Sequence, residues 1–146
     1  MIEKCLSDWH QHLRGDLPGG LDALLAEDVV FYSPIVFTPQ RGKEITKLYL
    51  QAASNTFSEG ASSNSSRATS GEGKAKAFRY TKEVMSGNTA VLEFESTIDG
   101  KYINGVDIIT CNDEGKIVEF KVMIRPLQAV NWMHQRMAAM LEKLKP

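Results

Sequence analysis

A β-hairpin pattern between Tyr102 and Pro126 constrains the fold more than any other part of the sequence. Two runs rich in β-branched and aromatic residues flank residues 112–115, Asn-Asp-Glu-Gly, whose polar start and closing glycine are typical of a tight turn. In the second run every other residue is apolar, which is the period of a half-buried strand. We expect one face of this strand to contact a core through Val118, Phe120, Val122 and Ile124.

Asp107 interrupts the first run of the hairpin. It is the only charged residue between positions 102 and 112, and both of its neighbours are β-branched. A carboxylate buried in ionised form among apolar groups is very unfavourable, so it becomes protonated or finds a hydrogen-bond donor. Asp107 is therefore the candidate catalytic acid or hydrogen-bond donor to a ligand. The alternative is a structural acid that is bonded to Trp9, Ser33 or a tyrosine.

The remaining segments predict an α+β domain. Apolar residues recur at helical spacing in four segments: residues 2–14, 21–25, 45–57 and 127–144. Strand-like runs occupy three further segments: residues 29–32, 78–85 and 89–98. The last two join the hairpin in a four-stranded antiparallel meander. The closing helix is expected to pack through Leu127, Val130, His134, Met137, Leu141 and Leu144.

Residues 58–73 differ in composition from the rest of the chain. They contain only small and polar residues besides Glu59, Arg67 and Glu72. Such a stretch cannot bury enough apolar surface to offset the entropy lost on ordering. We therefore expect a flexible serine-rich loop at 58–73, inside a single domain that spans residues 1–146.

The composition argues against several classes of function. A formal net charge of -1 gives no electrostatic basis for binding nucleic acid or an anionic membrane. No run of about 18 apolar residues predicts a membrane span, and the N-terminus lacks a signal-peptide pattern. Cys5 and Cys111 lack the spacing of zinc ligands and are expected to be buried free thiols, as suits the reducing cytoplasm. The sequence shows no phosphate-binding loop or catalytic triad, and we predict neither a metal nor a cofactor.

Three stretches resemble the nuclear transport factor 2-like superfamily, which includes ketosteroid isomerases and SnoaL-like polyketide cyclases. They are residues 24–31 followed by Ser33-Pro34 and Gly42-Lys43, residues 105–109 followed by 113–117, and residues 122–126. The resemblance implies a cone-shaped, curved antiparallel sheet packed on N-terminal helices, with a C-terminal helix and a pocket between them. It also implies that Asp107 points inward, where ketosteroid isomerases keep a protonated aspartic acid.

Two positions depart from the isomerase pattern. The catalytic base of those enzymes is an aspartate directly before a proline at the end of the first strand, and Ser33 stands there in this sequence. Their oxyanion tyrosine lies on the first helix, where Trp9 is the matching residue. An indole donates one hydrogen bond but cannot act as an acid. The sequence therefore argues against isomerisation of the steroid type.

Apolar residues of the cone are expected to line or underlie the pocket. The candidate ligand-binding residues are Trp9, Phe31, Ser33, Leu92, Phe94, Phe120, Val122, Ile124 and Arg125. Arg125 either anchors a ligand carboxylate through its planar guanidinium group or forms an internal ion pair. His134 is expected to be packed on its helix, and His10 and His12 are expected at the surface.

Three functions remain open at this point. One is an enzyme that performs cofactor-free cyclisation, isomerisation or dehydration of a small apolar molecule, with Asp107 as the acid. Another is a module that binds such a molecule without chemistry. The third is an interaction domain whose sheet face pairs in a homodimer. The sequence does not choose between an enzyme and a binding protein.

Overall fold

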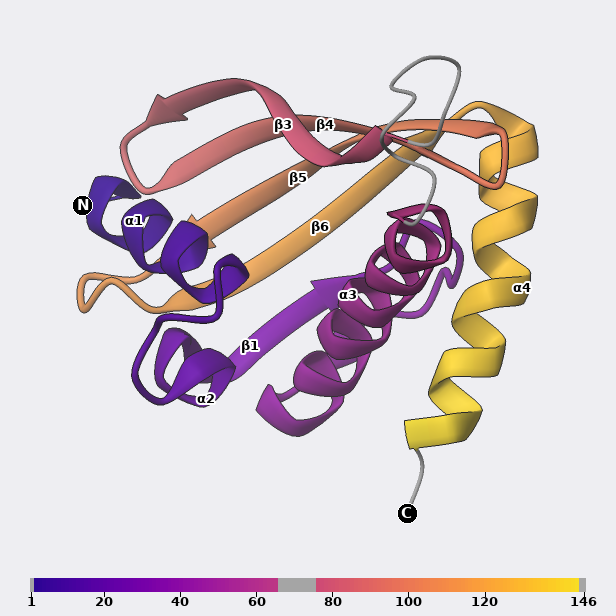
Figure 1. Cartoon of the computed structure of the whole chain (residues 1–146). Coiled ribbons are helices and arrows are strands. Elements are labelled where there is room, and N and C mark those ends of the chain that lie inside the picture. Colours follow the sequence, from indigo (N-terminus) through magenta and orange to yellow (C-terminus); the bar gives the residue numbers. More distant parts are fainter. Residues whose placement is uncertain (1, 66–75, 145–146) are drawn as a thin grey trace.

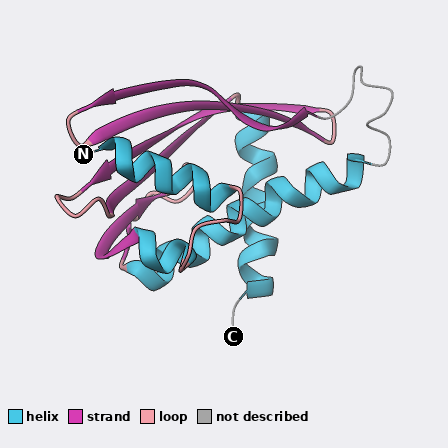
Figure 2. Ribbon diagram, turned by 60° about the vertical axis from the view of Figure 1, so that its left-hand side comes forward, coloured by secondary structure: helices cyan, strands magenta, loops and turns pink. Residues whose placement is uncertain are grey.

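The computed structural model describes residues 2–65 and 76–144 (Figures 1 and 2). The helices are α1 (Ile2–Leu13), α2 (Gly20–Leu24), α3 (Lys43–Ser65) and α4 (Leu127–Leu144). The strands are β1 (Leu25–Tyr32), β2 (Gln40–Arg41), β3 (Lys76–Ser86), β4 (Thr89–Ile98), β5 (Lys101–Cys111) and β6 (Ile117–Arg125).

The strands form one six-stranded sheet in the order β2-β1-β6-β5-β4-β3. Strands β3 to β6 pair antiparallel in sequence order, which confirms the predicted meander. Strand β1 adds to β6 in parallel, with Phe31 beside Phe120, so the sheet is mixed. Figure 1 shows the sheet curving over α1 and α3, with α4 at one end. The α+β cone expected from the sequence is confirmed.

Alternation along the strands places the core on the concave face of the sheet. In β4 the inward residues are all buried, and the same holds for the odd-numbered residues of β5 from Ile103 onward. A register shift between Thr110 and Cys111 leaves Val118 without a partner in β5, as in a β-bulge. Ile117 therefore takes the inward place that the sequence pattern assigned to Val118.

Helix α3 extends to Ser65, so residues 58–65 are helical and not part of a loop. The expectation of a loop over 58–73 is wrong for this half. Once a helix is nucleated, each added residue gains a backbone hydrogen bond at small entropic cost, and small residues such as Ala61 permit this. The other half of the expected loop, residues 66–73, lies outside the described residues.

The predicted stripe of α4 is confirmed only in part: Met137 packs on the cluster around Trp132 and lines the cavity, but other members of the stripe face outward. Leu127 is 73% exposed and His134 is also exposed, whereas Ala129, Trp132, Met133 and Met140 are buried. Both sets of residues repeat at spacings of three and four, so the sequence period is compatible with either face. Packing against α3 and the sheet selects the face that carries Trp132 and Met133.

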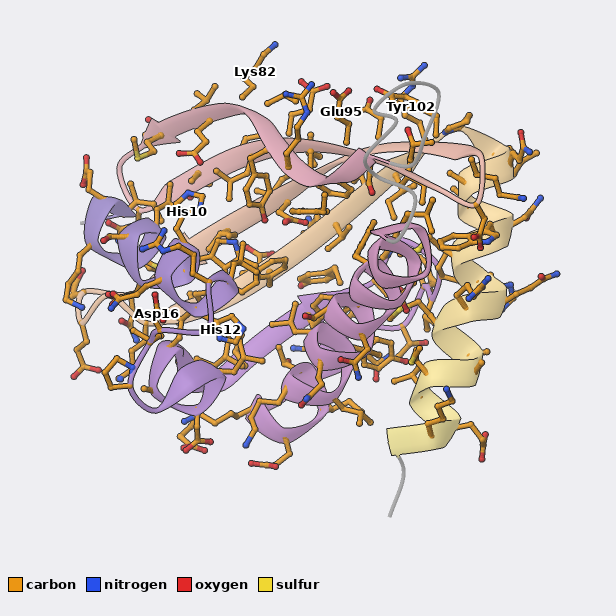
Figure 3. All side chains as sticks on the ribbon, in the orientation of Figure 1. His10, His12, Asp16, Lys82, Glu95 and Tyr102 are labelled. Atoms are coloured by element: carbon orange, nitrogen blue, oxygen red, sulfur yellow. The ribbon has the colours of Figure 1, made fainter. Side chains whose placement is uncertain are left out.

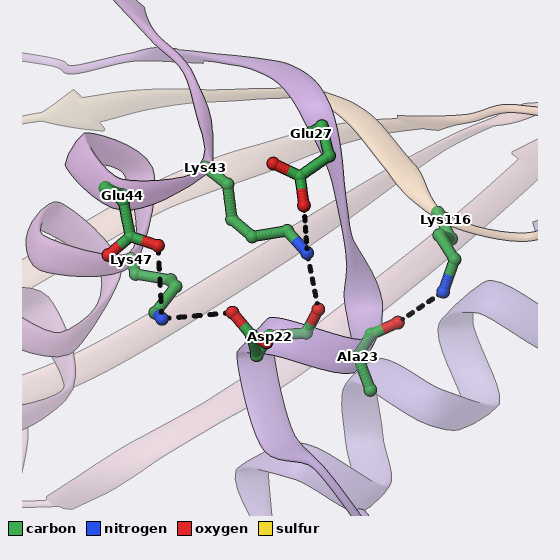
Figure 4. A network of polar contacts seen from close by, with 7 residues as sticks. All are labelled: Asp22, Ala23, Glu27, Lys43, Glu44, Lys47 and Lys116. Atoms are coloured by element: carbon green, nitrogen blue, oxygen red, sulfur yellow. Dashed lines mark hydrogen bonds and ion pairs between the residues drawn. The ribbon is translucent and has the colours of Figure 1, made fainter.

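A polar network joins α2, β1 and α3 to the turn between β5 and β6 (Figure 4). Lys43 Nζ donates to the carbonyl oxygen of Asp22 at 2.8 Å and lies 3.2 Å from Glu27 Oε2. Lys116 Nζ donates to the carbonyl oxygen of Ala23 at 2.8 Å. These bonds use carbonyl oxygens at the end of α2 that have no partner within the helix. None of the helices in residues 2–65 and 76–144 has the length and apolar character needed to cross a membrane.

Candidate functional site

A cavity of about 420 Å³ lies between the concave face of the sheet and helices α1, α3 and α4. Its walls are mainly aromatic and thioether side chains: Phe31, Phe57, Phe78, Phe94, Phe120, Met133 and Met137. The volume falls within the range of small-molecule binding sites. Such walls favour an apolar ligand, because removing apolar surface from water is the main source of binding free energy here.

Trp9, Tyr80 and Asp107 form a hydrogen-bonded chain in the cavity wall. They come from three elements, since α1 turns its buried stripe inward and β3 and β5 carry Tyr80 and Asp107 on their inner faces. The Trp9 indole N–H donates to the Tyr80 hydroxyl at 3.0 Å. That hydroxyl donates to Asp107 Oδ2 at 2.5 Å. The sequence left open that Asp107 is a structural acid bonded to a tyrosine, and Tyr80 is that tyrosine.

The surroundings of Asp107 favour its neutral form. The side chain is only 6% exposed, and burial raises the pKa of its carboxyl from 3.8 to about 7, although the bond from Tyr80 opposes this shift. Burial and the nearby carboxylate raise the pKa of Tyr80 well above its ordinary value. Among the described residues only Oδ2 of Asp107 has a hydrogen-bond partner. Oδ1 is therefore the atom that remains for a ligand.

His12 also lines the cavity, so the expectation that it is a surface residue is wrong. It follows Trp9 by three positions, which places both on one side of α1, and their ring centroids are 5.5 Å apart. Burial lowers the pKa of His12 from its ordinary value, which keeps the imidazole neutral near pH 7. His10 instead faces β3, where its Nε2 lies 2.7 Å from Glu83 Oε2 (Figure 3).

Ser33 lines the cavity, but its hydroxyl oxygen is engaged in hydrogen bonds to the local backbone. Ser33 Oγ accepts hydrogen bonds from the backbone N–H groups of Ile35 at 3.0 Å and Val36 at 3.2 Å. This is the local turn that serine commonly forms after a strand. A hydroxyl cannot replace a carboxylate as a base without a further group to take its proton.

Seven of the nine residues proposed as ligand contacts stand at the cavity: Trp9, Phe31, Ser33, Phe94, Phe120, Val122 and Ile124. Leu92 is instead fully buried in the core cluster beneath α1. Arg125 is exposed and donates to Asn104 Oδ1 at 3.1 Å on the convex face of the sheet. We expect no direct ligand contact from Leu92 or Arg125, and Arg125 is not the partner of Asp107.

Sequence reasoning did not single out Tyr80 or His12. Tyr80 alternates with Phe78, which indicates that both face the same side of the strand. The alternation does not continue along β3, because its pairing register shifts between Lys76 and Arg79 and again between Tyr80 and Lys82. The signal for His12 was its spacing of three from Trp9. No set of three or more His, Cys, Asp or Glu side chains in residues 2–65 and 76–144 is arranged to hold a metal ion.

Comparison with protein-family models and with curated proteins finds no match to the sequence. Solved structures do match. A steroid delta-isomerase from Pseudomonas aeruginosa superposes with a TM-score of 0.77 and 27% identity, over 97% of this chain and 92% of that chain. A protein with a cystatin-like fold from Silicibacter pomeroyi gives a TM-score of 0.72 and 26% identity, over 92% of this chain and 83% of that chain. An NTF2-like protein from Mesorhizobium loti shares the fold, with a TM-score of 0.62 and 16% identity over 86% and 91% of the two chains.

Proposed function

Because the chain belongs to the nuclear transport factor 2-like superfamily, we propose that it binds a small, neutral, apolar carbonyl compound and that Asp107 acts on the carbonyl oxygen without a cofactor. The observation that carries this proposal is a protonatable acid in the wall of an apolar cavity, held by Tyr80 at 2.5 Å. A neutral carboxylic acid can donate a hydrogen bond from Oδ1 to a carbonyl oxygen, whereas a carboxylate cannot.

The same arrangement supports acid catalysis. An acid whose pKa lies near the working pH is present in both forms and can give up its proton in a reaction. Tyr80 stabilises the carboxylate that forms, since its O–H already points at Oδ2. Protonation of a carbonyl oxygen as a neighbouring C–H loses its proton to water produces an enol, which is the first step of an isomerisation or cyclisation. The 27% identity to a steroid delta-isomerase favours chemistry of this kind on a ring ketone.

Binding of 2-tetralone and tetralin, measured by calorimetry between pH 6 and pH 8, tests the role of Asp107. The ketone oxygen only accepts hydrogen bonds, so it requires protonated Asp107. With a pKa of about 7, we expect the affinity for 2-tetralone to fall by about tenfold from pH 6 to pH 8. Tetralin, which has no oxygen, should show no such dependence, and Asp107→Asn should remove the dependence for the ketone. Equal pH profiles for both compounds would refute the proposal.

A non-catalytic binding protein is the second candidate, and it is favoured by the absence of a carboxylate base at position 33 and by the hydrogen bonds of Ser33. Ser33 replaces the isomerase base, and its oxygen already accepts two backbone N–H groups. Exchange of the α-hydrogens of 2-tetralone for deuterium, followed by NMR, separates the two candidates. An enzyme should accelerate the exchange and lose this activity in Asp107→Asn. A binding protein should show pH-dependent affinity without exchange.

We also propose that the convex face of the sheet pairs two copies of the chain. Three large apolar side chains on this face are about half exposed: Val84 at 54%, Tyr102 at 46% and Met123 at 53%. They stand among charged residues such as Lys82 and Glu95, which point away from the helices in Figure 3. Tyr and Met are enriched in the cores of subunit interfaces, and the rims of such interfaces are polar, which supports this pairing.

A further inference from the structure

We infer that His12 forms a second polar contact in the cavity, and that the ligand is a rigid apolar molecule with a carbonyl oxygen at one end and a hydroxyl group at the other. This inference rests on the proposed function, because it takes the carbonyl oxygen to lie at Asp107. It adds the second group of the ligand and the residue that recognises it.

The two histidines of α1 differ in their partners. His10 Nε2 is paired with Glu83, and its ring packs edge-on against Tyr80 at 5.7 Å. His12 lines the cavity, and within the described residues neither of its ring nitrogens has a hydrogen-bond or ion-pair partner. A half-buried ring whose nitrogens have no partner in the protein is available to whatever occupies the adjoining cavity.

Apart from Ser54, which is exposed on α3, the other polar side chains at the cavity already have partners. Ser33 Oγ accepts from two backbone groups, and Arg79 is paired with Glu95. The Tyr80 hydroxyl accepts from Trp9 and donates to Asp107. His12 is thus the nitrogen base at the cavity that is left for a second ligand group.

The arrangement of these residues places the two free polar groups at opposite ends of a series of contacts. Asp107, Tyr80, Trp9 and His12 follow one another, joined by contacts of 2.5 Å, 3.0 Å and a ring separation of 5.5 Å. The Tyr80 hydroxyl oxygen and the Trp9 indole therefore lie between Asp107 and His12 in this series of contacts. A fused bicyclic molecule with oxygens at opposite ends would place its apolar middle against the aromatic walls.

Neutral imidazole supplies one acceptor nitrogen and one N–H donor. Burial lowers the pKa of His12, which preserves that acceptor near neutral pH. A ligand hydroxyl can donate to the acceptor nitrogen, whereas an ether at the same place cannot. The net contribution of one such bond corresponds to a gain in affinity of about fivefold to tenfold.

Three ketones of nearly equal shape test this inference by calorimetry at pH 6.5: 2-tetralone, 6-hydroxy-2-tetralone and 6-methoxy-2-tetralone. The wild-type protein should bind the hydroxy compound about fivefold to tenfold more tightly than 2-tetralone, and the methoxy compound should show no such gain. His12→Phe keeps a ring against Trp9 but removes both nitrogens. It should abolish the gain, which is measured as the ratio of the affinities for the hydroxy compound and 2-tetralone in the same variant. His12→Gln, which retains an acceptor oxygen, should keep part of the gain.

The outcomes distinguish this inference from the proposed function. Two results would overturn the role of His12 alone. One is that His12→Phe still binds the hydroxy compound more tightly than 2-tetralone. The other is that the wild-type protein shows no such preference, although it binds 2-tetralone with the expected pH dependence. Loss of the pH dependence for 2-tetralone, or no binding of any of the ketones, overturns both proposals. Should His12→Phe fail to fold, wild type is compared with His12→Gln instead. A purely structural role of His12 predicts that His12→Gln loses the same factor of affinity for all three ketones, whereas recognition of the hydroxyl predicts a larger loss for the hydroxy compound.

Discussion

The carboxyl of Asp107 links stability to pH in a direction opposite to that of most acidic residues. Its pKa is about 7 in the folded protein, whereas the ordinary value for an aspartate, taken for the unfolded chain, is 3.8. Between these two pH values the folded state therefore binds more protons than the unfolded state does. Stability is therefore lost as pH rises through this window, by up to about 4 kcal/mol. We expect Asp107→Asn to match wild type near pH 3.5, below the unfolded pKa, and to be more stable at pH 8, as measured by urea unfolding.

Asp113→Asn serves as the control for this experiment, because it removes an exposed carboxyl on the turn between β5 and β6. Its stability should follow the wild-type pH profile. A loss of several kcal/mol in Asp107→Asn at pH 8 would instead show that Asp107 is an ionised acid in a stabilising pair.

Gly105 permits the close packing of Phe94 beside the cavity. A Cβ atom at this position would lie 2.6 Å from Phe94 Cζ and would also overlap the carbonyl oxygen of Met123 in the next strand. The second overlap involves backbone, so rotation of a side chain cannot relieve it. We expect Gly105→Ala to lower the free energy of unfolding by about 1–3 kcal/mol and to weaken ligand binding as Phe94 moves into the cavity. Val106→Ala, a change on the convex face of the same strand, should leave ligand binding intact. Unchanged stability in Gly105→Ala would mean that β6 moves away at little cost.

At the scale of elements, the face of α4 that packs on the molecule can be tested with two substitutions. Met133 is 3% exposed and belongs to the cluster around Trp132, whereas Leu127 is 73% exposed. Met133→Ala should lower the free energy of unfolding by about 2 kcal/mol, near the low end for such changes because the side chain borders an existing cavity. Leu127→Ala should change it by less than about 0.5 kcal/mol in urea unfolding. The reverse order of these effects would show that the helix is rotated about its axis.

For the whole molecule, pairing through the convex face predicts a solution mass of about twice 16.2 kDa. Light scattering coupled to size-exclusion chromatography measures this directly. Met123→Lys places a charge among the exposed apolar residues of that face and should give a monomer. A pair of sheet faces of standard size buries about 800 Å² on each partner, and a charge at its centre is poorly tolerated. Leu127→Lys, on the exposed side of α4, is the matched control and should leave the dimer intact. A monomeric wild type at micromolar concentration would refute this assembly.

Local patterns in the sequence determined most of the architecture. The period of two in β4 and most of β6 determined which side chains face the core, because successive strand residues point to opposite faces. The inward orientation of Asp107 was implied by the resemblance to the superfamily, and its burial at 6% exposure agrees with that expectation. Turn residues at 112–115 fixed the hairpin, and the spacing of Cys5, Leu6 and Trp9 fixed the inner face of α1.

Tertiary structure alone decided what surrounds Asp107 and how the helices are oriented. The bond from Tyr80 joins residues 27 positions apart, and it depends on the register of β3, which two irregularities shift. The position of His12 at the cavity and the rotation of α4 depend on packing between elements. A helical period shows that one face is buried, but several faces of α4 carry apolar residues at the right spacing. Only the shape of the neighbouring surface selects among them, because close packing penalises a misfit that no local pattern records.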